Sequence, residues 1–229
     1  MKKEIKLTVE EFEFNGYMAT VIRPKNPNGK WIWKTEFLYA FDQAEIALCE
    51  KGFTRVYYCI SDKYGSNNAV RLMHAFHLFV TEKYGLEKKA NLFGFSRGGL
   101  YAFNYALFYP EYVSKVYLDA PVLDLKTWPP KDSMEQLQLF NEYGLNADAL
   151  VSFKGNPVDN LSEFFALQIP LLIVAGAADE VVPFEFNAGK LIKYCNANNI
   201  KIISIIKPTC LHHPHSLVDV SPIVDFIKK

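Results

Sequence analysis

Short apolar runs alternate with helical patterns along most of this chain. The apolar runs carry few charges, which indicates strands that are buried on both faces of a sheet. They predict strands at about residues 30–33, 55–60, 90–95, 115–119, 169–175 and 200–206. The segments between them predict helices at about residues 37–51, 68–84, 98–109, 184–196 and 222–227. Such alternation predicts an α/β fold with a mostly parallel, doubly wound sheet.

The N-terminal part of the chain has a different pattern. Polar and apolar residues alternate over residues 7–14 and 17–23, and Asn15 and Gly16 lie between these segments. An Asn-Gly pair in this position indicates a β-hairpin, because both residues readily adopt the positive φ that the turn needs. We therefore expect an antiparallel hairpin at the N-terminal edge of the sheet.

One connection is much longer than a crossover needs. Residues 121–168 lie between two predicted strands and contain helical patterns at 133–143 and 146–153. A long connection with helices of its own predicts a small cap inserted over the active site. Its aromatic residues could line a substrate pocket or form the core of the cap; they are Trp128, Phe140, Phe153, Phe164 and Phe165. We expect a single domain over residues 1–229, with the cap at about 121–168.

Residues 94–98 read GFSRG at the point where a predicted strand runs into a predicted helix. A GxSxG sequence in this setting is typical of a nucleophile elbow, a sharp turn that holds a serine hydroxyl clear of the sheet. The flanking glycines avoid side chains that would collide in so tight a turn. Ser96 is therefore the candidate nucleophile.

A serine hydroxyl is a weak nucleophile unless a neutral imidazole takes its proton. Asp179 follows the apolar run 169–175, and His212 follows the run 200–206. Functional sites in open α/β sheets form beyond the carboxyl ends of the strands, so these two side chains are expected near Ser96. We expect His212 to move the proton and Asp179 to orient its ring, in the chain order Ser, Asp, His.

Neighbouring residues leave two alternatives open. Asp119 ends the strand after the elbow helix and could replace the downstream aspartate as the acid. His213 could replace His212 as the base, but it precedes Pro214, which favours an extended backbone that turns successive side chains apart. A metal held by His212, His213 and His215 would need three ligands from four positions around a stiff proline, so we expect no metal site.

These motifs resemble those of the α/β-hydrolase superfamily, and the resemblance extends over about residues 14–227. It rests on the blocks WIWKTEF (31–37), GFSRGGLYAFNYA (94–106), GAADEVVP (176–183) and HHPHSL (212–217). The blocks are similar to those of a bacterial group of small serine hydrolases and esterases. The resemblance implies an α/β-hydrolase fold and a carboxylic ester hydrolase that acts through an acyl-enzyme on a small or medium substrate.

The resemblance also implies an oxyanion hole made of two backbone amides. The first is the amide of Arg97, which follows the nucleophile. The second is expected in the loop after the third strand, and because this chain has no HGGG motif we assign it to Lys34 or Thr35. One residue departs from the pattern: similar sequences tend to have glycine where this chain has Leu211, which would strain the loop if that position needs a positive φ.

Composition sets limits on partners and compartment. The chain has 25 basic and 25 acidic residues and a formal net charge of zero, which argues against nucleic acid or an anionic membrane as a partner. Its four cysteines show no CxxC spacing, and its start has no apolar signal-peptide segment, so a cytoplasmic location is expected. A small-molecule ester is the expected partner. The sequence predicts no cofactor and leaves the oligomeric state open.

Two other functions fit the same motifs. The Ser-His-Asp arrangement also supports peptide hydrolysis, so a serine peptidase is one alternative. A hydrolase fold that has lost its activity and serves as a binding protein is the other. Labelling of Ser96 by a fluorophosphonate would distinguish an active enzyme from such a protein.

Overall fold

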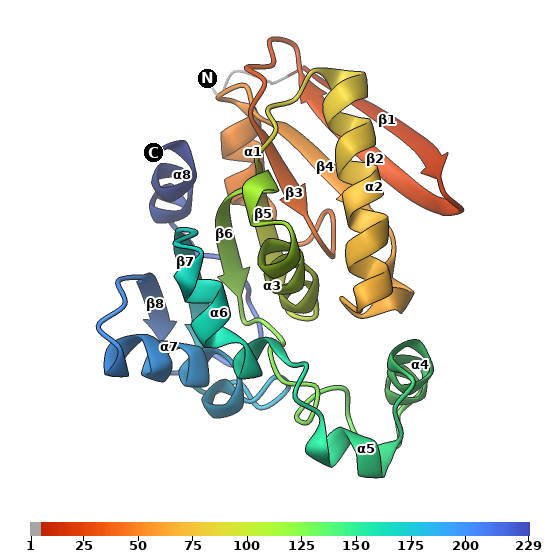
Figure 1. Cartoon of the computed structure of the whole chain (residues 1–229). Coiled ribbons are helices and arrows are strands. Elements are labelled where there is room, and N and C mark those ends of the chain that lie inside the picture. Colours follow the sequence, from red (N-terminus) through yellow and green to blue (C-terminus); the bar gives the residue numbers. More distant parts are fainter. Residues whose placement is uncertain (1–5) are drawn as a thin grey trace.

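A single sheet forms the centre of the molecule. In the computed structural model, which describes residues 6–229, eight strands pair in the order β1-β2-β4-β3-β5-β6-β7-β8 (Figure 1). The strands are β1 (Leu7–Phe14), β2 (Tyr17–Pro24), β3 (Trp31–Lys34), β4 (Thr54–Tyr58), β5 (Ala90–Phe95), β6 (Val113–Asp119), β7 (Leu171–Gly176) and β8 (Ile203–Lys207). β2 pairs antiparallel with β1 and β4, and all other neighbours are parallel. This confirms the predicted mostly parallel sheet with an antiparallel N-terminal hairpin.

Helices cover both faces of the sheet. They are α1 (Gln43–Cys49), α2 (Asn67–Tyr84), α3 (Gly98–Phe108), α4 (Met134–Tyr143), α5 (Ala147–Ser152), α6 (Leu161–Ala166), α7 (Ala188–Ala197) and α8 (Ser221–Lys228). α2, α3 and α7 pack on one face and contribute to the larger core cluster. α1 and α8 pack on the opposite face, against the smaller cluster (Figure 1). Both faces of the central strands are thereby buried, which explains their continuous apolar runs.

Most predicted boundaries agree with the structure within about two residues, and three do not. The helix predicted from residue 184 begins only at Ala188, after a 3₁₀ turn at Phe184–Phe186. The helix predicted from residue 37 begins only at Gln43, because Phe37 and Phe41 both have positive φ and therefore belong to a turn. The strand predicted from residue 200 begins at Ile203, and its residues are exposed or half-buried because β8 is an edge strand. The short helix α6 was not among the predicted elements.

The long connection between β6 and β7 carries α4, α5 and α6. α4 packs on residues 61–66, where the Tyr64 hydroxyl donates to the Gln138 side chain at 2.8 Å and the Ser66 hydroxyl donates to Glu142 at 2.6 Å. α6 lies on α3, because the Phe164 ring stacks on Phe103 with ring centroids 4.3 Å apart. Figure 1 shows α4 and α5 at the margin of the molecule, beyond the carboxyl ends of the strands.

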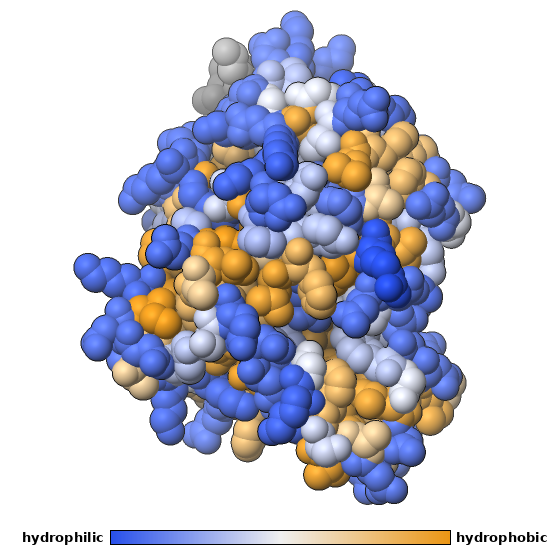
Figure 2. Space-filling view, in the orientation of Figure 1, coloured by the Kyte–Doolittle hydropathy of each residue, from blue (hydrophilic) through white to orange (hydrophobic). Residues whose placement is uncertain are grey.

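This segment exposes apolar side chains on its outer surface. Met134 and Leu137 of α4 and Val151 of α5 are exposed. Figure 2 shows apolar residues in a band across the middle of this face and in a second area at the lower right, over α4 and α5. Over residues 6–229, no helix combines the length and the apolarity that a bilayer crossing requires.

Candidate active site

Ser96 lies in a strained turn between β5 and α3. Its φ is +49°, a left-handed conformation that costs a non-glycine residue about 1–3 kcal/mol. Bonds on both sides hold this conformation: the Ser96 amide donates to the Asp119 carbonyl at 2.9 Å, and its carbonyl accepts from the amides of Gly99 and Val122. The turn directs the backbone away from the sheet as the GFSRG sequence predicts.

The glycines around Ser96 are required by close packing. A Cβ on Gly94 would lie 2.9 Å from the Ala102 Cβ, so β5 and α3 could not approach as closely. A Cβ on Gly98 would lie 2.8 Å from the Thr35 hydroxyl and 3.1 Å from the Glu36 Cβ. The GxSxG pattern therefore brings three segments together: β5, α3 and the loop after β3.

Ser96, His212 and Asp179 form a continuous chain of contacts. His212 Nε2 lies 3.0 Å from Ser96 Oγ, and His212 Nδ1 lies 2.7 Å from Asp179 Oδ2. The other carboxylate oxygen, Asp179 Oδ1, accepts the amides of Val181 and Val182 at 3.0 and 2.9 Å. All three side chains are buried. The structure thus brings together the three residues that the sequence predicts as nucleophile, base and acid.

Backbone hydrogen bonds join the segments that carry Asp179 and His212. The amides of Ala177 and Ala178 donate to the carbonyls of Lys207 and Cys210, at 3.0 and 3.1 Å. Gly176 permits this approach, since a Cβ there would collide with the carbonyl oxygens of Cys210 and Leu211. Leu211 is not among the residues with positive φ, so the strain that its departure from glycine could cause does not arise.

Asp119, the alternative acid, contacts a different histidine. Its Oδ1 lies 2.8 Å from Nδ1 of His215, and its Oδ2 accepts the Ser216 amide at 2.8 Å and the Tyr117 hydroxyl at 2.5 Å. Asp119 and His215 are both buried. A second Asp–His pair therefore lies beside the first, and sequence reasoning did not identify His215 as its partner.

His213, the alternative base, is exposed and its ring stacks on Phe41, with centroids 5.8 Å apart and an angle of 16° between the planes. Desolvation lowers the pKa of His213, and the adjacent His215 and His212 lower it further. His212 is the histidine in hydrogen-bonding distance of Ser96.

The oxyanion assignment needs a correction in the loop after β3. The Thr35 amide donates to the Phe93 carbonyl at 3.0 Å, and Lys34 lies inside β3, paired with Tyr57 and Phe93. Thr35 does not fit the role because its amide is already bonded, and Lys34 does not fit because it is a paired residue of β3. Over residues 6–229, the amides of Arg97, Glu36 and Phe37 have no acceptor in the protein. A second donor is therefore available just beyond the two residues assigned from the sequence.

The side chain of Lys34 has a structural role. Its ammonium group contacts Glu45 Oε1 at 2.5 Å and lies 3.3 Å from the centre of the Phe95 ring, with no solvent exposure. Burial lowers the pKa of Lys34, and the Glu45 carboxylate opposes this shift. The ammonium group thus ties β3 to α1 and does not reach a substrate.

Glu36 is a residue near the site that sequence reasoning missed. Its Oε2 accepts the Ser61 hydroxyl at 2.9 Å and an Arg97 guanidinium N–H at 3.2 Å. Burial raises the pKa of Glu36, while the Arg97 charge opposes the shift. The only signal in the sequence was its place in the WIWKTEF block. The Glu36–Arg97 pair links the loop after β3 to the residue that follows Ser96.

A cavity of about 160 Å³ opens beside Ser96. Most of its walls are aromatic rings; it is lined by Phe37, Ala40, Phe41, Phe95, Ser96, His212, His213 and His215. The cavity therefore favours a small apolar or aromatic group next to the serine hydroxyl.

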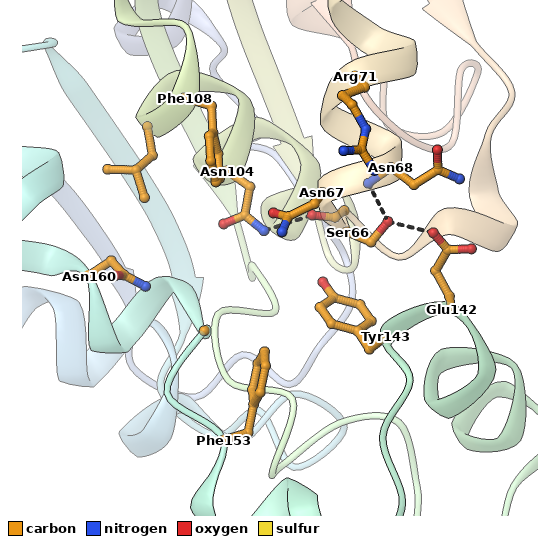
Figure 3. Close-up of a pocket in the computed structure, with 13 residues that line it drawn as sticks. Ser66, Asn67, Asn68, Arg71, Asn104, Phe108, Glu142, Tyr143, Phe153 and Asn160 are labelled. Carbon is orange, nitrogen blue, oxygen red and sulfur yellow. Dashed lines mark hydrogen bonds between the residues drawn. The ribbon is translucent and has the colours of Figure 1, made fainter.

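The aromatic residues expected to line a pocket under the cap do not reach this cavity. Phe164 is buried against α3, as the core of the segment would require. Phe153 lines a second, more polar cavity of about 440 Å³ between α2, α3 and the α4–α6 segment (Figure 3). Figure 3 shows Asn104 and Tyr143 facing that cavity, which shares no lining residue with the one at Ser96.

Comparisons with known proteins agree with this architecture. A family model of the α/β-hydrolase fold matches residues 55–157. The search of curated proteins gave no match. Two solved structures of similar size align over nearly the whole chain. The first is FphF, a fluorophosphonate-binding serine hydrolase of Staphylococcus aureus, with 15% identity, a TM-score of 0.72 and coverage of 99% of this chain and 96% of that one.

The second is the esterase Pf2001 of Pyrococcus furiosus, with 15% identity, a TM-score of 0.65 and coverage of 98% and 92%. Larger peptidases share the fold as well. A puromycin-hydrolyzing peptidase of Mycobacterium tuberculosis aligns with 98% of this chain at 13% identity and a TM-score of 0.69, but only 38% of its own length is covered. The chain spans 33% to 40% of the length of the peptidases that it resembles. At these identities the similarity establishes the α/β-hydrolase fold.

Proposed function

We propose that this chain, a member of the α/β-hydrolase superfamily, is a serine hydrolase that cleaves carboxylic esters of small or medium size through an acyl-enzyme. The observation that carries the proposal is the chain of contacts from Ser96 Oγ through His212 to Asp179, at 3.0 and 2.7 Å. Each contact is short enough for the proton movements that acyl transfer needs.

The proposed reaction has two halves. Ser96 Oγ attacks the ester carbonyl while His212 Nε2 takes its proton, and the imidazolium then gives that proton to the departing alkoxide. A water molecule, activated by the same nitrogen, attacks the acyl-enzyme, and the proton returns to Ser96 as the acid is released. Asp179 fixes the imidazole tautomer and stabilises the imidazolium. Hydrogen bonds from the backbone amides of Val181 and Val182 hold its carboxylate in place.

Negative charge on the carbonyl oxygen needs two donors. We assign the first to the Arg97 amide and the second to an amide of Glu36 or Phe37, since these three amides have no acceptor among residues 6–229. The Glu36–Arg97 contact at 3.2 Å connects the two sides of this oxyanion hole. Its role is to hold both amides in one orientation before substrate arrives.

The cavity and the comparisons favour an ester over a peptide. A volume of about 160 Å³ with aromatic walls suits a small acyl or alcohol group better than an extended peptide. The aligned proteins of matching length include a serine hydrolase and an esterase, whereas the peptidases are much longer. We further propose that residues 121–168 act as a cap that limits the size of the substrate.

A screen with p-nitrophenyl esters of increasing acyl length tests this function. We expect turnover to be highest for short chains and to fall as the acyl group outgrows the cavity. Peptide p-nitroanilides, run in parallel, should react far more slowly; faster cleavage of the anilides would favour a peptidase. Absence of turnover together with absence of fluorophosphonate labelling would indicate a binding protein without activity.

A further inference from the structure

Three histidines crowd together beside Ser96. The ring centroids of His212, His213 and His215 lie 4.8 to 4.9 Å apart in all three pairs. Each ring offers a nitrogen that lies within 4.8 Å of the nitrogens offered by the other two. A tetrahedral zinc ion binds imidazole nitrogens at about 2.0–2.1 Å, which places them roughly 3.4 Å from one another. Small rotations of these side chains would therefore complete three corners of a tetrahedral site.

Buried carboxylates already orient two of the three rings. Nδ1 of His212 lies 2.7 Å from Asp179, and Nδ1 of His215 lies 2.8 Å from Asp119. A carboxylate that accepts one ring N–H leaves the lone pair of the other nitrogen available, and the same arrangement supports histidine ligands in metal sites. The site also gains negative charge behind both rings, which favours a cation.

The third ring provides access from solvent. His213 is exposed, and within the described part of the chain its ring is held by stacking on Phe41 and contacts with the neighbouring histidine rings. Its ring stacks on Phe41 at the rim of the small cavity. An ion can therefore meet His213 first and then the two buried rings.

Contrary to the expectation from the sequence, we propose that His212, His213 and His215 form an inhibitory binding site for a borderline-soft divalent cation such as Zn²⁺, because the folded loop brings their ring nitrogens within 4.8 Å of one another. The ion exchanges three of its water ligands for three imidazole nitrogens, with no change of oxidation state, and a water molecule holds the fourth position. It occupies the Nε2 lone pair of His212, which Ser96 needs as its proton acceptor. Inhibition thus rests on the proposed function, but binding of the ion does not.

Calorimetric titration of the chelator-treated full chain with zinc chloride tests the site. We expect one ion per chain and a loss of zinc affinity of at least about tenfold in His213→Ala. Removal of a direct metal ligand should weaken binding at least as much as removal of a group that only orients a ligand. Asp119→Asn should weaken binding about 10–100-fold through His215. His74→Ala is the matched control, since His74 stacks on Tyr109 far along the chain from the cluster. Unchanged affinity in His213→Ala would overturn the proposal.

A nearby thiol is another potential zinc ligand, and its contribution must be distinguished from that of the imidazoles. Cys210 Sγ lies 3.6 Å from the His213 carbonyl oxygen, and thiolates bind zinc tightly. Cys210→Ser should retain zinc binding if the histidines are the ligands, and loss of binding in this variant would refute the imidazole site. Magnesium chloride should bind far more weakly than zinc because Mg²⁺ prefers oxygen ligands.

Ester turnover in the presence of zinc separates this inference from the proposed function. Zinc should inhibit the wild-type chain over the concentration range in which it binds, and His213→Ala should need at least about tenfold more zinc for the same fractional inhibition. If the chain binds zinc as described but hydrolyses no ester, the site stands and the proposed function fails. If the chain hydrolyses esters but zinc does not inhibit it, the inhibitory site is wrong and the function stands.

Discussion

At the residue scale, two Asp–His pairs share one site and differ in what the histidine touches. His212 contacts both Asp179 and the Ser96 hydroxyl. His215 contacts Asp119 and lines the small cavity beside Ser96. Tyr117 and the Ser216 amide also bond to Asp119, so both of its carboxylate oxygens have partners. Of the two pairs, only His212–Asp179 contacts the Ser96 hydroxyl.

The two aspartates should therefore respond differently to the same substitution. Asp179→Asn keeps the size of the side chain but loses its charge and favours the wrong tautomer of His212, so kcat should fall by about three to four orders of magnitude. Asp119→Asn should lower kcat by about tenfold or less, because His215 does not contact Ser96. Steady-state kinetics on the best ester, with thermal unfolding as a control for folding, measure both. A larger loss of kcat in Asp119→Asn than in Asp179→Asn would indicate that Asp119, at the end of β6, is the catalytic acid.

The sequence could predict some site residues and not others, for a physical reason. Ser96, Asp179 and His212 each follow a strand, and parallel strands end at the same edge, so local pattern was enough to bring them together. Their roles in catalysis stay predictions. The prediction of Lys34 and Thr35 as oxyanion donors was wrong. Which amide is free depends on the residue at which strand pairing ends, and an error of one residue selects an amide that is already bonded. The contact between Asp119 and His215 spans 96 positions, and no local pattern signals it.

At the element scale, the ends of β7 and β8 act as one unit. The loop after β7 donates one backbone hydrogen bond to Lys207, the last residue of β8, and one to Cys210 in the loop that follows. These bonds hold together the segments that carry Asp179 and His212. The register of the two strands, with Gly176 opposite Lys207, places the first of these bonds directly after the ladder. The edge position of β8 also explains why an apolar run predicted a buried strand where the structure has a partly exposed one.

Gly176→Ala adds only one methyl group but should disturb the packing between the ends of β7 and β8. The added methyl group would collide with the carbonyls of Cys210 and Leu211, which forces the two loops apart and lengthens the contact between His212 and Asp179. We expect a loss of kcat/KM of at least about tenfold together with a lower Tm. Gly144→Ala is the matched control: its φ is +64° but its surroundings are open, so it should lower stability by about 1 kcal/mol and spare activity. Unaltered turnover in Gly176→Ala would show that the loops do not need this spacing.

At the scale of the whole molecule, the alternation of strands and helices predicted the architecture. The hairpin signal at Asn15 and Gly16 placed the antiparallel edge, and continuous apolar runs placed the central strands. The arrangement of residues 121–168 could not be predicted, because it depends on side-chain contacts with residues 61–66 that lie far away in the sequence. The expectation that this segment forms a cap stays a prediction.

The most direct test of the central claim is the turnover of Ser96→Ala. The substitution removes only the hydroxyl that lies 3.0 Å from His212, and alanine is no larger than serine. We predict that kcat/KM on the best p-nitrophenyl ester falls by at least about three orders of magnitude while the thermal unfolding curve stays close to that of the wild type. A folded variant that keeps more than about a tenth of the wild-type activity would contradict the assignment of Ser96 as the nucleophile.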